Sequence, residues 1–278
     1  MSKSQTSPQI PPKDQEDELS DECKKLLSTL PKERGWSVSH IYNYQGFWAK
    51  PRVIQGVIAC QQQFQAQDSD IILVTNPKSG TTWLKALLFT LVNRVKHPIL
   101  EQNHPLLLST HLLFASLPKF IQDSNTKLVY LCRNSRDTFI STWHFINNLN
   151  LDHKNTNFIG RAFDLFCNGI SPYGPFWNHV LDYWKIKRLA EFLECAFSKK
   201  EENCGVVDEI LRMCSFENLS NLEVNINGKL SSGHENKLFF RKGKVGDWKN
   251  YFTTEMKEKL NHINEQKFQG SGLKFHYI

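Results

Sequence analysis

The 278-residue sequence lacks the features that identify membrane, secreted and nucleic-acid-binding proteins. It has no apolar run long enough to cross a membrane, and residues 1–5 contain no apolar core of a secretion signal. It also has no concentrated run of Lys or Arg, although 34 basic residues outnumber 28 acidic ones. We therefore expect a cytoplasmic protein with no membrane or nucleic-acid partner and with a basic pocket for a small polyanion.

The sequence also lacks a Cys-x-x-Cys pair, internal repeats and low-complexity tracts. Its seven cysteines are an odd number and stand mostly among apolar neighbours, so we expect buried, reduced thiols. A chain of this length can bury one substantial core. We expect a flexible tail at residues 1–15, which hold three prolines, and one α/β domain at residues 16–278.

Residues 71–95 are the most informative stretch. Residues 71–75 are mostly β-branched and apolar, residues 76–82 are polar, and apolar residues then recur at helical spacing. This pattern predicts a strand, a loop and an amphipathic helix. Small loop residues leave backbone N–H groups open at a helix N-terminus, and Lys78 adds a cation, so we expect the loop to bind phosphate. The small residues are Ser79, Gly80, Thr81 and Thr82.

Two alternatives for this loop stay open at this point. An ordinary polar turn that caps a helix would have a similar composition, because short motifs often occur without their function. A standard ATP or GTP loop is disfavoured, since Lys78 precedes Gly80 and no glycine begins the loop.

Two further segments are expected to supply cations. Residues 127–132 are predicted to be a second buried strand, and the polar turn 133–137 follows it. Because the carboxyl ends of parallel strands lie at one edge of a sheet, this turn and the loop after residue 75 are expected to face one ligand. Residues 241–246 hold three cations and two glycines, which fits either a phosphate-wrapping loop or a solvated basic turn.

The remaining pattern is largely helical. Helices are predicted from residue 16 to 30, from Pro51 onward and, with one break, from 163 to 197, whereas residues 93–109 are predicted to be a loop. Residues 41–48 are densely aromatic, for which core packing is favoured over the wall of an aromatic-binding pocket.

Two polar residues are ambiguous when taken alone. His111 stands just ahead of an apolar run, and a single histidine is usually structural. Ser141 is expected inside the helix after the turn 133–137, where serine is more often neutral filler than a ligand.

Three fragments in one order resemble a known family: Thr75–Trp83, Cys132–Asp137 with Ser141, and Arg241–Asn250. Together they resemble the cytosolic sulfotransferases, and the agreement with the plant members extends through Cys214–Asn225. The resemblance covers nearly the whole chain after the tail. It implies transfer of a sulfuryl group from 3′-phosphoadenosine 5′-phosphosulfate (PAPS) to a hydroxyl of a small aromatic or steroid-like acceptor, such as a flavonoid.

The resemblance also implies residue roles. Lys78 and His111 match the catalytic residues: Lys78 would donate to the bridging oxygen of the leaving phosphate, and His111 would take the acceptor's hydroxyl proton. Trp83 and Phe216 match adenine-stacking positions. No metal is required. The implied donor-binding residues are Lys78, Ser79, Gly80, Thr81, Thr82, Trp83, Arg133, Ser141, Phe216, Arg241, Lys242 and Gly243. A weak homodimer is implied by residues at the family's dimer motif, namely Lys249, Thr253, Thr254 and Glu258.

Two family segments have no counterpart in the sequence. An acceptor lid would stand between Leu107 and Ser109, and a strand with a tyrosine near the adenine would follow Lys185. Because loss of a strand exposes its neighbours, the second hypothesis is a truncated, inactive or nucleotide-binding-only relative. The third, a nucleotide kinase, predicts an acidic metal ligand where Arg133 stands.

Overall fold

The computed structural model describes residues 19–36, 40–94, 106–124, 126–149, 158–184, 203–230 and 233–273. The predicted flexible tail lies outside these residues, as do Cys195 and the part of the predicted helix from 185 to 197. Within the described ranges, no helix is both long enough and apolar enough to cross a membrane.

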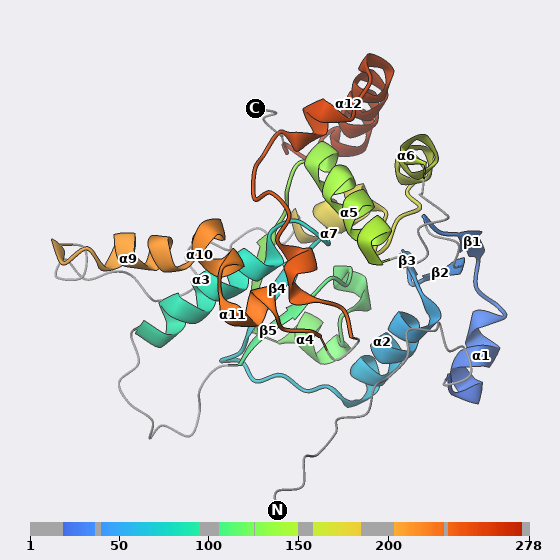
Figure 1. The fold of residues 1–278 in the computed structure, drawn as a ribbon. Coiled ribbons are helices and arrows are strands. Elements are labelled where there is room, and N and C mark those ends of the chain that lie inside the picture. Colours follow the sequence, from blue (N-terminus) through green and yellow to red (C-terminus); the bar gives the residue numbers. More distant parts are fainter. Residues whose placement is uncertain are drawn as a thin grey trace, which may run out of the picture.

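A parallel sheet lies at the centre of the fold (Figure 1). Strand β4 (Ile71–Thr75) runs between β5 (Leu107–Thr110) and β6 (Lys127–Leu131), and both pairings are parallel. All five residues of β4 are buried, in agreement with its continuous apolar sequence. The predicted α/β fold with a central parallel sheet is confirmed, and the carboxyl ends of the strands meet at one edge.

Two helices follow these strands directly. β4 leads through residues 76–80 into α3 (Thr81–Arg94), and β6 leads into α5 (Ser135–Leu149). The other helices of the described ranges are α1 (Asp21–Leu27), α2 (Pro51–Gln63), α4 (Lys119–Asp123), α6 (Ile159–Cys167), α7 (Phe176–Trp184), α9 (Val206–Met213), α10 (Phe216–Ser220), α11 (Glu223–Ile226) and α12 (Thr254–Phe268), with short 3₁₀ turns η2 (Phe114–Ser116), η3 (Asn236–Phe239) and η4 (Asp247–Asn250). Figure 1 shows α9 beside α3, and α12 next to the start of α5, where the Asn264 amide donates to the Ser135 hydroxyl at 3.0 Å.

The buried side chains form two clusters. The first packs α1 and α2 against the sheet and includes Ile54, Ile72 and Val74. The second joins α5, α6, α7 and α12 and includes Phe139 and Trp177. Burial of large apolar side chains in both clusters fixes the helices on which the functional loops are mounted.

An antiparallel sheet near the N-terminus was not predicted from the sequence. It comprises β1 (Lys32–Arg34), β2 (His40–Tyr44) and β3 (Phe47–Ala49). The hairpin between β2 and β3 turns at Gln45 and Gly46, which both have positive φ, at 48° and 89°. Two such residues give a turn whose twist matches the paired strands, and glycine adopts this conformation without steric cost.

Several predicted element bounds are wrong. Residues 107–109 belong to β5, because pairing with β4 makes a strand of a segment too short to show a periodic pattern. The first helix begins at Asp21 and ends at Leu27, inside the predicted range, because Ser20 caps its N-terminus. α5 starts at Ser135, so the predicted turn 133–137 includes the first helical residues.

The cysteines and β6 bear on two other expectations. Cys23 and Cys214 are buried free thiols, but Cys204 is exposed because it lies in the turn before α9, so predicted burial is wrong there. In the described part of the sheet, β6 pairs on one side only, and four of its five residues are half-buried.

Candidate active site

The loop between β4 and α3 presents backbone N–H groups to a cavity. Lys78 and Gly80 have positive φ, at 66° and 111°, and the Ser79 N–H donates to the Asn76 carbonyl at 3.2 Å. The first helical bond runs from the Leu84 N–H to the Gly80 carbonyl at 3.0 Å. The N–H groups of residues 81–83 therefore have no acceptor within the helix and favour an anion.

Lys78 is a half-buried cation without a carboxylate partner among the described residues. Its Nζ lies 4.2 Å from the ring centroid of Phe145 and 5.2 Å from that of Phe239, positions that suit a cation–π interaction. Burial, with the nearby charges of Arg241 and Arg133, lowers the pKa of Lys78 to about 8. The buried Ser79 hydroxyl also lacks a hydrogen-bond partner in the described part of the chain. Both features fit a bound anion.

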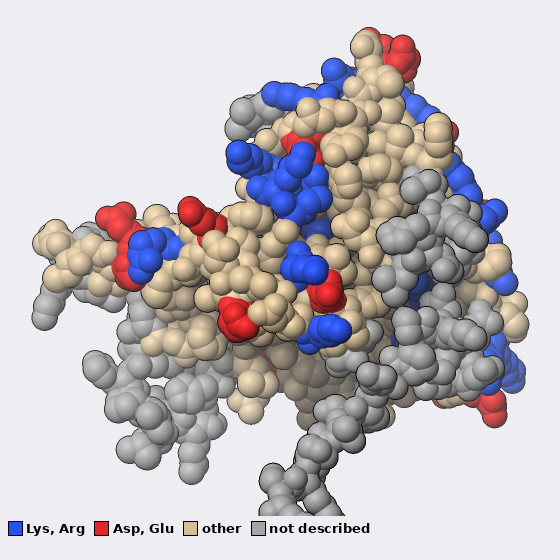
Figure 2. Space-filling view, in the orientation of Figure 1, with Lys and Arg blue, Asp and Glu red and all other residues tan. Residues whose placement is uncertain are grey.

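A second cationic group lies farther along the cavity. The Arg133 guanidinium donates to the Lys244 carbonyl at 2.9 Å, which joins the turn after β6 to the segment that follows η3. Arg241 and Lys242 both pair with Asp247, at 2.6 and 2.7 Å. Figure 2 shows Lys and Arg side chains gathered over the segment between η3 and α12.

Asp137 fastens this segment to the start of α5. Its carboxylate accepts the Gly246 N–H at 2.9 Å and lies 3.6 Å from the Arg133 guanidinium. Because Asp137 is buried, these contacts are shielded from water and hold the loop in place. Sequence reasoning did not single out Asp137 or Asp247. The Gly246 partner of Asp137 is distant in the chain, whereas Asp247 pairs with Arg241 and Lys242 of its own loop.

Gly243 lets an aromatic ring approach the backbone closely. Its φ is 63°, and a Cβ at this position would lie 2.4 Å from the ring of Phe216. Phe216 is 37% exposed and Trp83 is 42% exposed, so both present ring surface that a planar base could cover.

His111 directly follows β5 and is held by β4. Its Nδ1 lies 2.7 Å from the Thr75 carbonyl oxygen, and Thr75 Oγ1 lies 2.6 Å from Thr81 Oγ1. A carbonyl only accepts, so Nδ1 carries the hydrogen and Nε2 keeps a free lone pair. Burial lowers the pKa of His111, the Thr75 carbonyl raises it, and the charges of Lys78 and Lys85 lower it. A neutral imidazole of this kind can accept a proton.

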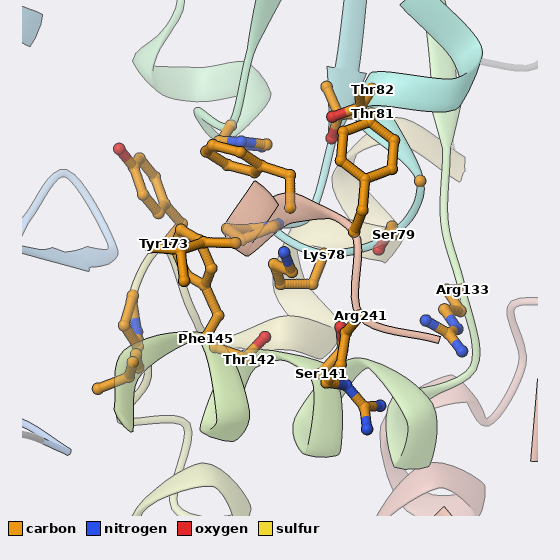
Figure 3. A pocket seen from close by; sticks show the side chains of 18 of the residues that line it. Lys78, Ser79, Thr81, Thr82, Arg133, Ser141, Thr142, Phe145, Tyr173 and Arg241 are labelled. Carbon is orange, nitrogen blue, oxygen red and sulfur yellow. The ribbon is translucent and has the colours of Figure 1, made fainter. Parts of the chain in front are cut away.

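One cavity of about 1120 Å³ brings together the predicted site residues. Figure 3 shows Lys78 near its middle, with Arg133 and Arg241 toward one side and Phe145 and Tyr173 toward the other. Every residue predicted for catalysis or donor binding lines it: Lys78, Ser79, Gly80, Thr81, Thr82, Trp83, His111, Arg133, Ser141, Phe216, Arg241, Lys242 and Gly243.

The apolar side of the cavity differs from the sequence-based expectation. Core packing, the favoured interpretation of residues 41–48, is correct for Phe47, which is fully buried. Ile41 and Trp48 from the same segment line the cavity instead, together with Phe145 of α5. The apolar lining that was missed includes Trp36, Ile41, Trp48, Ile146, Leu149 and Tyr173.

Strand alternation could have identified one of these residues. Phe47 and Trp48 are neighbours in β3, so their side chains point to opposite faces, and burial of Phe47 turns Trp48 toward the cavity. Tyr173 gave no such signal, because it depends on an irregular turn in which its φ is 60°. Its ring packs edge-on against His111, with 5.4 Å between the centroids.

The described residues contain no group of three or more His, Cys, Asp or Glu side chains that could hold a metal ion. β6 is followed by Cys132 and Arg133, where a kinase-type metal site would need a carboxylate.

Comparisons with known proteins point to one family. The family model described as "Sulfotransferase domain" matches residues 68–99, 92–189 and 185–272. Cytosolic sulfotransferase 12 of Arabidopsis thaliana is 42% identical over 94% of this chain and 96% of its own length. The crystal structure of an Arabidopsis thaliana candidate steroid sulphotransferase matches with a TM-score of 0.68 and 35% identity, covering 96% of this chain and all of that one. A mouse sulfotransferase complexed with PAP matches with a TM-score of 0.64 and 24% identity, over 84% and 96% of the two chains.

The alignment with cytosolic sulfotransferase 12 also shows how many aligned positions have no residue in this chain. It spans 316 positions but uses 94% of a 278-residue chain, about 261 residues, so about 55 positions have no residue here. The matched stretches of the family model meet at 92–99 and 185–189. The second junction coincides with the gap inferred after Lys185, and the first lies ahead of the gap inferred between Leu107 and Ser109.

Proposed function

This chain belongs to the sulfotransferase family, and from that premise we propose that it transfers a sulfuryl group from PAPS to a hydroxyl of a small aromatic or steroid-like acceptor. The observation that carries the proposal is the single cavity lined by the phosphate-type loop, the second cationic group and His111. The Arabidopsis relative of this chain is named a cytosolic sulfotransferase, in keeping with the predicted cytoplasmic location.

The two cationic regions suit a donor with phosphates at both ends. The N–H groups of residues 81–83, the Ser79 hydroxyl and Lys78 would hold the 5′-phosphosulfate. Arg133, Ser141 and the turn 241–243 would hold the 3′-phosphate. The exposed rings of Trp83 and Phe216 would enclose the adenine, since stacking suits a purine face. The mouse structure holds PAP, the product of this donor, in the same fold.

The apolar side of the cavity suits a flat or steroid-like acceptor. Trp48, Phe145 and Tyr173 are half-buried and provide aromatic surface. His111 packs against Tyr173 and is also close enough to Lys78 to be affected by its charge. Such walls bind apolar rings through burial and leave polar groups to orient the reacting hydroxyl. A shortened lid would leave this side more open to water.

The proposed reaction needs one proton acceptor and one charge-stabilising donor. The acceptor oxygen attacks sulfur, the new O–S bond forms, and the bond from sulfur to the bridging phosphate oxygen breaks. Nε2 of His111 accepts the hydroxyl proton, and the Lys78 ammonium donates a hydrogen bond to the departing oxygen, where negative charge builds. The products are the sulfate ester, PAP and a proton released from His111.

We propose that the chain forms a weak homodimer, on the ground of the residues that match the family's dimer motif. They are exposed side chains around the start of α12: Lys249, Thr253, Thr254 and Glu258. Sedimentation equilibrium of the purified chain tests this. Wild type should show some dimer, and the double variant Thr253→Glu, Thr254→Glu should show only monomer.

A second candidate is a relative that binds nucleotide without turnover. It is favoured by the 55 or so absent positions and by the half-buried β6. The kinase hypothesis, which already ranked third, is further disfavoured because the family model that matches is that of the sulfotransferases.

Two measurements on the purified 278-residue chain separate the candidates. PAP should raise the melting temperature, and incubation with PAPS and a panel of flavonols, steroids and simple phenols should give a sulfate ester detected by mass spectrometry. A PAP-induced shift without any ester favours the nucleotide-binding relative. No shift at millimolar PAP would refute the donor site itself.

A further inference from the structure

His179 is a fully buried histidine for which the proposed mechanism has no use. It lies on α7, is 0% exposed, and both of its ring nitrogens have partners. Nε2 lies 3.1 Å from the backbone carbonyl oxygen of His111, and Nδ1 lies 3.0 Å from the hydroxyl of Tyr130. A carbonyl only accepts, so Nε2–H donates to His111, and the Tyr130 O–H donates to Nδ1.

A second side chain of α7 holds the next carbonyl. The Tyr183 hydroxyl donates to the Leu112 carbonyl at 2.9 Å. Residues 179 and 183 are four apart, so they lie on one face of the helix. The Tyr183 ring stacks on Tyr130, with centroids 4.7 Å apart and planes 11° apart. One helix face and one strand residue therefore form a rigid bracket around the backbone of residues 111–112.

The bracket begins where sheet pairing ends. The last residue of β5 paired with β4 is Thr110, opposite Val74. The carbonyls of His111 and Leu112 therefore lie beyond the ladder and need other partners to be fixed. Burial lowers the pKa of His179 to about 4, so its ring stays neutral and keeps Nδ1 as an acceptor at ordinary pH.

We propose that His179 is a positioning residue for His111, holding its backbone so that the imidazole meets both the Thr75 carbonyl and the acceptor hydroxyl. This inference rests on the proposed function only in taking His111 as the base. A displacement of about 1 Å in a reacting group can lower the rate about 100-fold, so losing the hydrogen bond that holds the His111 backbone is enough to reduce kcat measurably.

The test compares His179→Phe, which fills the volume but removes both hydrogen bonds, with His179→Gln, whose amide N–H can still reach the His111 carbonyl. In His179→Phe we expect kcat to fall about 10- to 100-fold while KM for PAPS and the affinity for PAP stay within about twofold. His179→Gln should recover most of the rate. Unchanged kcat in His179→Phe, or an equal loss of kcat and PAP affinity in both variants, would overturn the inference.

A readout that needs no turnover separates this inference from the proposed function. In ¹⁵N NMR of histidine-labelled protein, the wild-type His111 ring should show a protonated Nδ1, and in His179→Phe it should show a mixture of tautomers. Tyr130→Phe, which keeps His179 but removes the donor to its Nδ1, should shift the His111 signals in the same direction. Protein that forms no sulfate ester but shows these shifts refutes the function and supports the positioning role. Unshifted His111 signals in both folded variants refute the positioning role.

Discussion

Nδ1 of the His111 imidazole lies 2.7 Å from the backbone carbonyl oxygen of Thr75, the last residue of β4. The same strand leads directly into the loop that carries Lys78. The proposed base and the proposed cation are therefore positioned by one buried strand, and β4 sets their relative placement independently of the acceptor.

The pH dependence of kcat/KM should be bell-shaped. His111 must be neutral to accept a proton, and its pKa is lowered, so the acidic limb should lie below pH 6.5. Lys78 must be protonated to stabilise the leaving group, so activity should fall as pH rises through about 8. Lys85→Gln should move the acidic limb to higher pH, because the Lys85 charge lowers the pKa of His111. Lys119→Gln, at an exposed lysine of α4, is the matched control and should leave both limbs in place.

Binding of PAP should take up protons near pH 8. Lys78 is about half protonated there, and a bound phosphate favours its charged form, so complex formation should absorb about half a proton. Isothermal titration calorimetry in two buffers with different ionisation enthalpies measures this number. In Lys78→Met the uptake should largely disappear. Equal uptake in both proteins would show that another group is responsible.

Gly243→Ala should weaken PAP binding by about 10- to 100-fold, because the added Cβ would meet the Phe216 ring and disturb both the ring and the cationic turn. Gly205→Ala is a close control, since Gly205 also has positive φ, at 73°, but open space around it. Its PAP affinity should stay within about twofold of wild type. Equal losses in the two variants would assign the effect to backbone strain and contradict the packing argument.

Asp247 should contribute stability that disappears in acid. Burial raises its pKa, but hydrogen bonds from Lys242, Arg241 and Asn250 outweigh burial and lower the pKa from an ordinary 3.8 to about 2. The ionised carboxylate therefore stabilises the fold above about pH 4, and this contribution is lost as pH falls toward 2. Urea midpoints measured across this range should fall more steeply for wild type than for Asp247→Asn. Parallel curves would contradict the assignment.

Much of the donor side could be predicted from the sequence, because it is encoded locally. The strand–loop–helix unit at 71–95 follows from an apolar run, a small-residue loop and helical spacing, and the cations Arg133, Arg241 and Lys242 stand in short polar turns. The loop residues 78–82 and these three cations all line the cavity. The continuous apolar run of residues 71–74 also explains why β4 is buried.

The acceptor side could not be predicted, because it depends on contacts between distant segments. Trp36 comes from the N-terminal sheet region, Tyr173 from an irregular turn and Leu149 from the end of α5. β5 was missed because four residues gain strand structure only by pairing with β4. The bracket of Tyr130, His179 and Tyr183 likewise joins a strand to a helix almost 50 residues later.

The most direct test of the account compares sulfate-ester formation from PAPS by wild type and His111→Ala, with any acceptor that the screen identifies. Wild type should form the ester, and His111→Ala should do so about 100- to 10,000-fold more slowly while binding PAP with unchanged affinity. Near-normal turnover in His111→Ala, or no ester from wild type under any condition in which it binds PAP, would contradict the account.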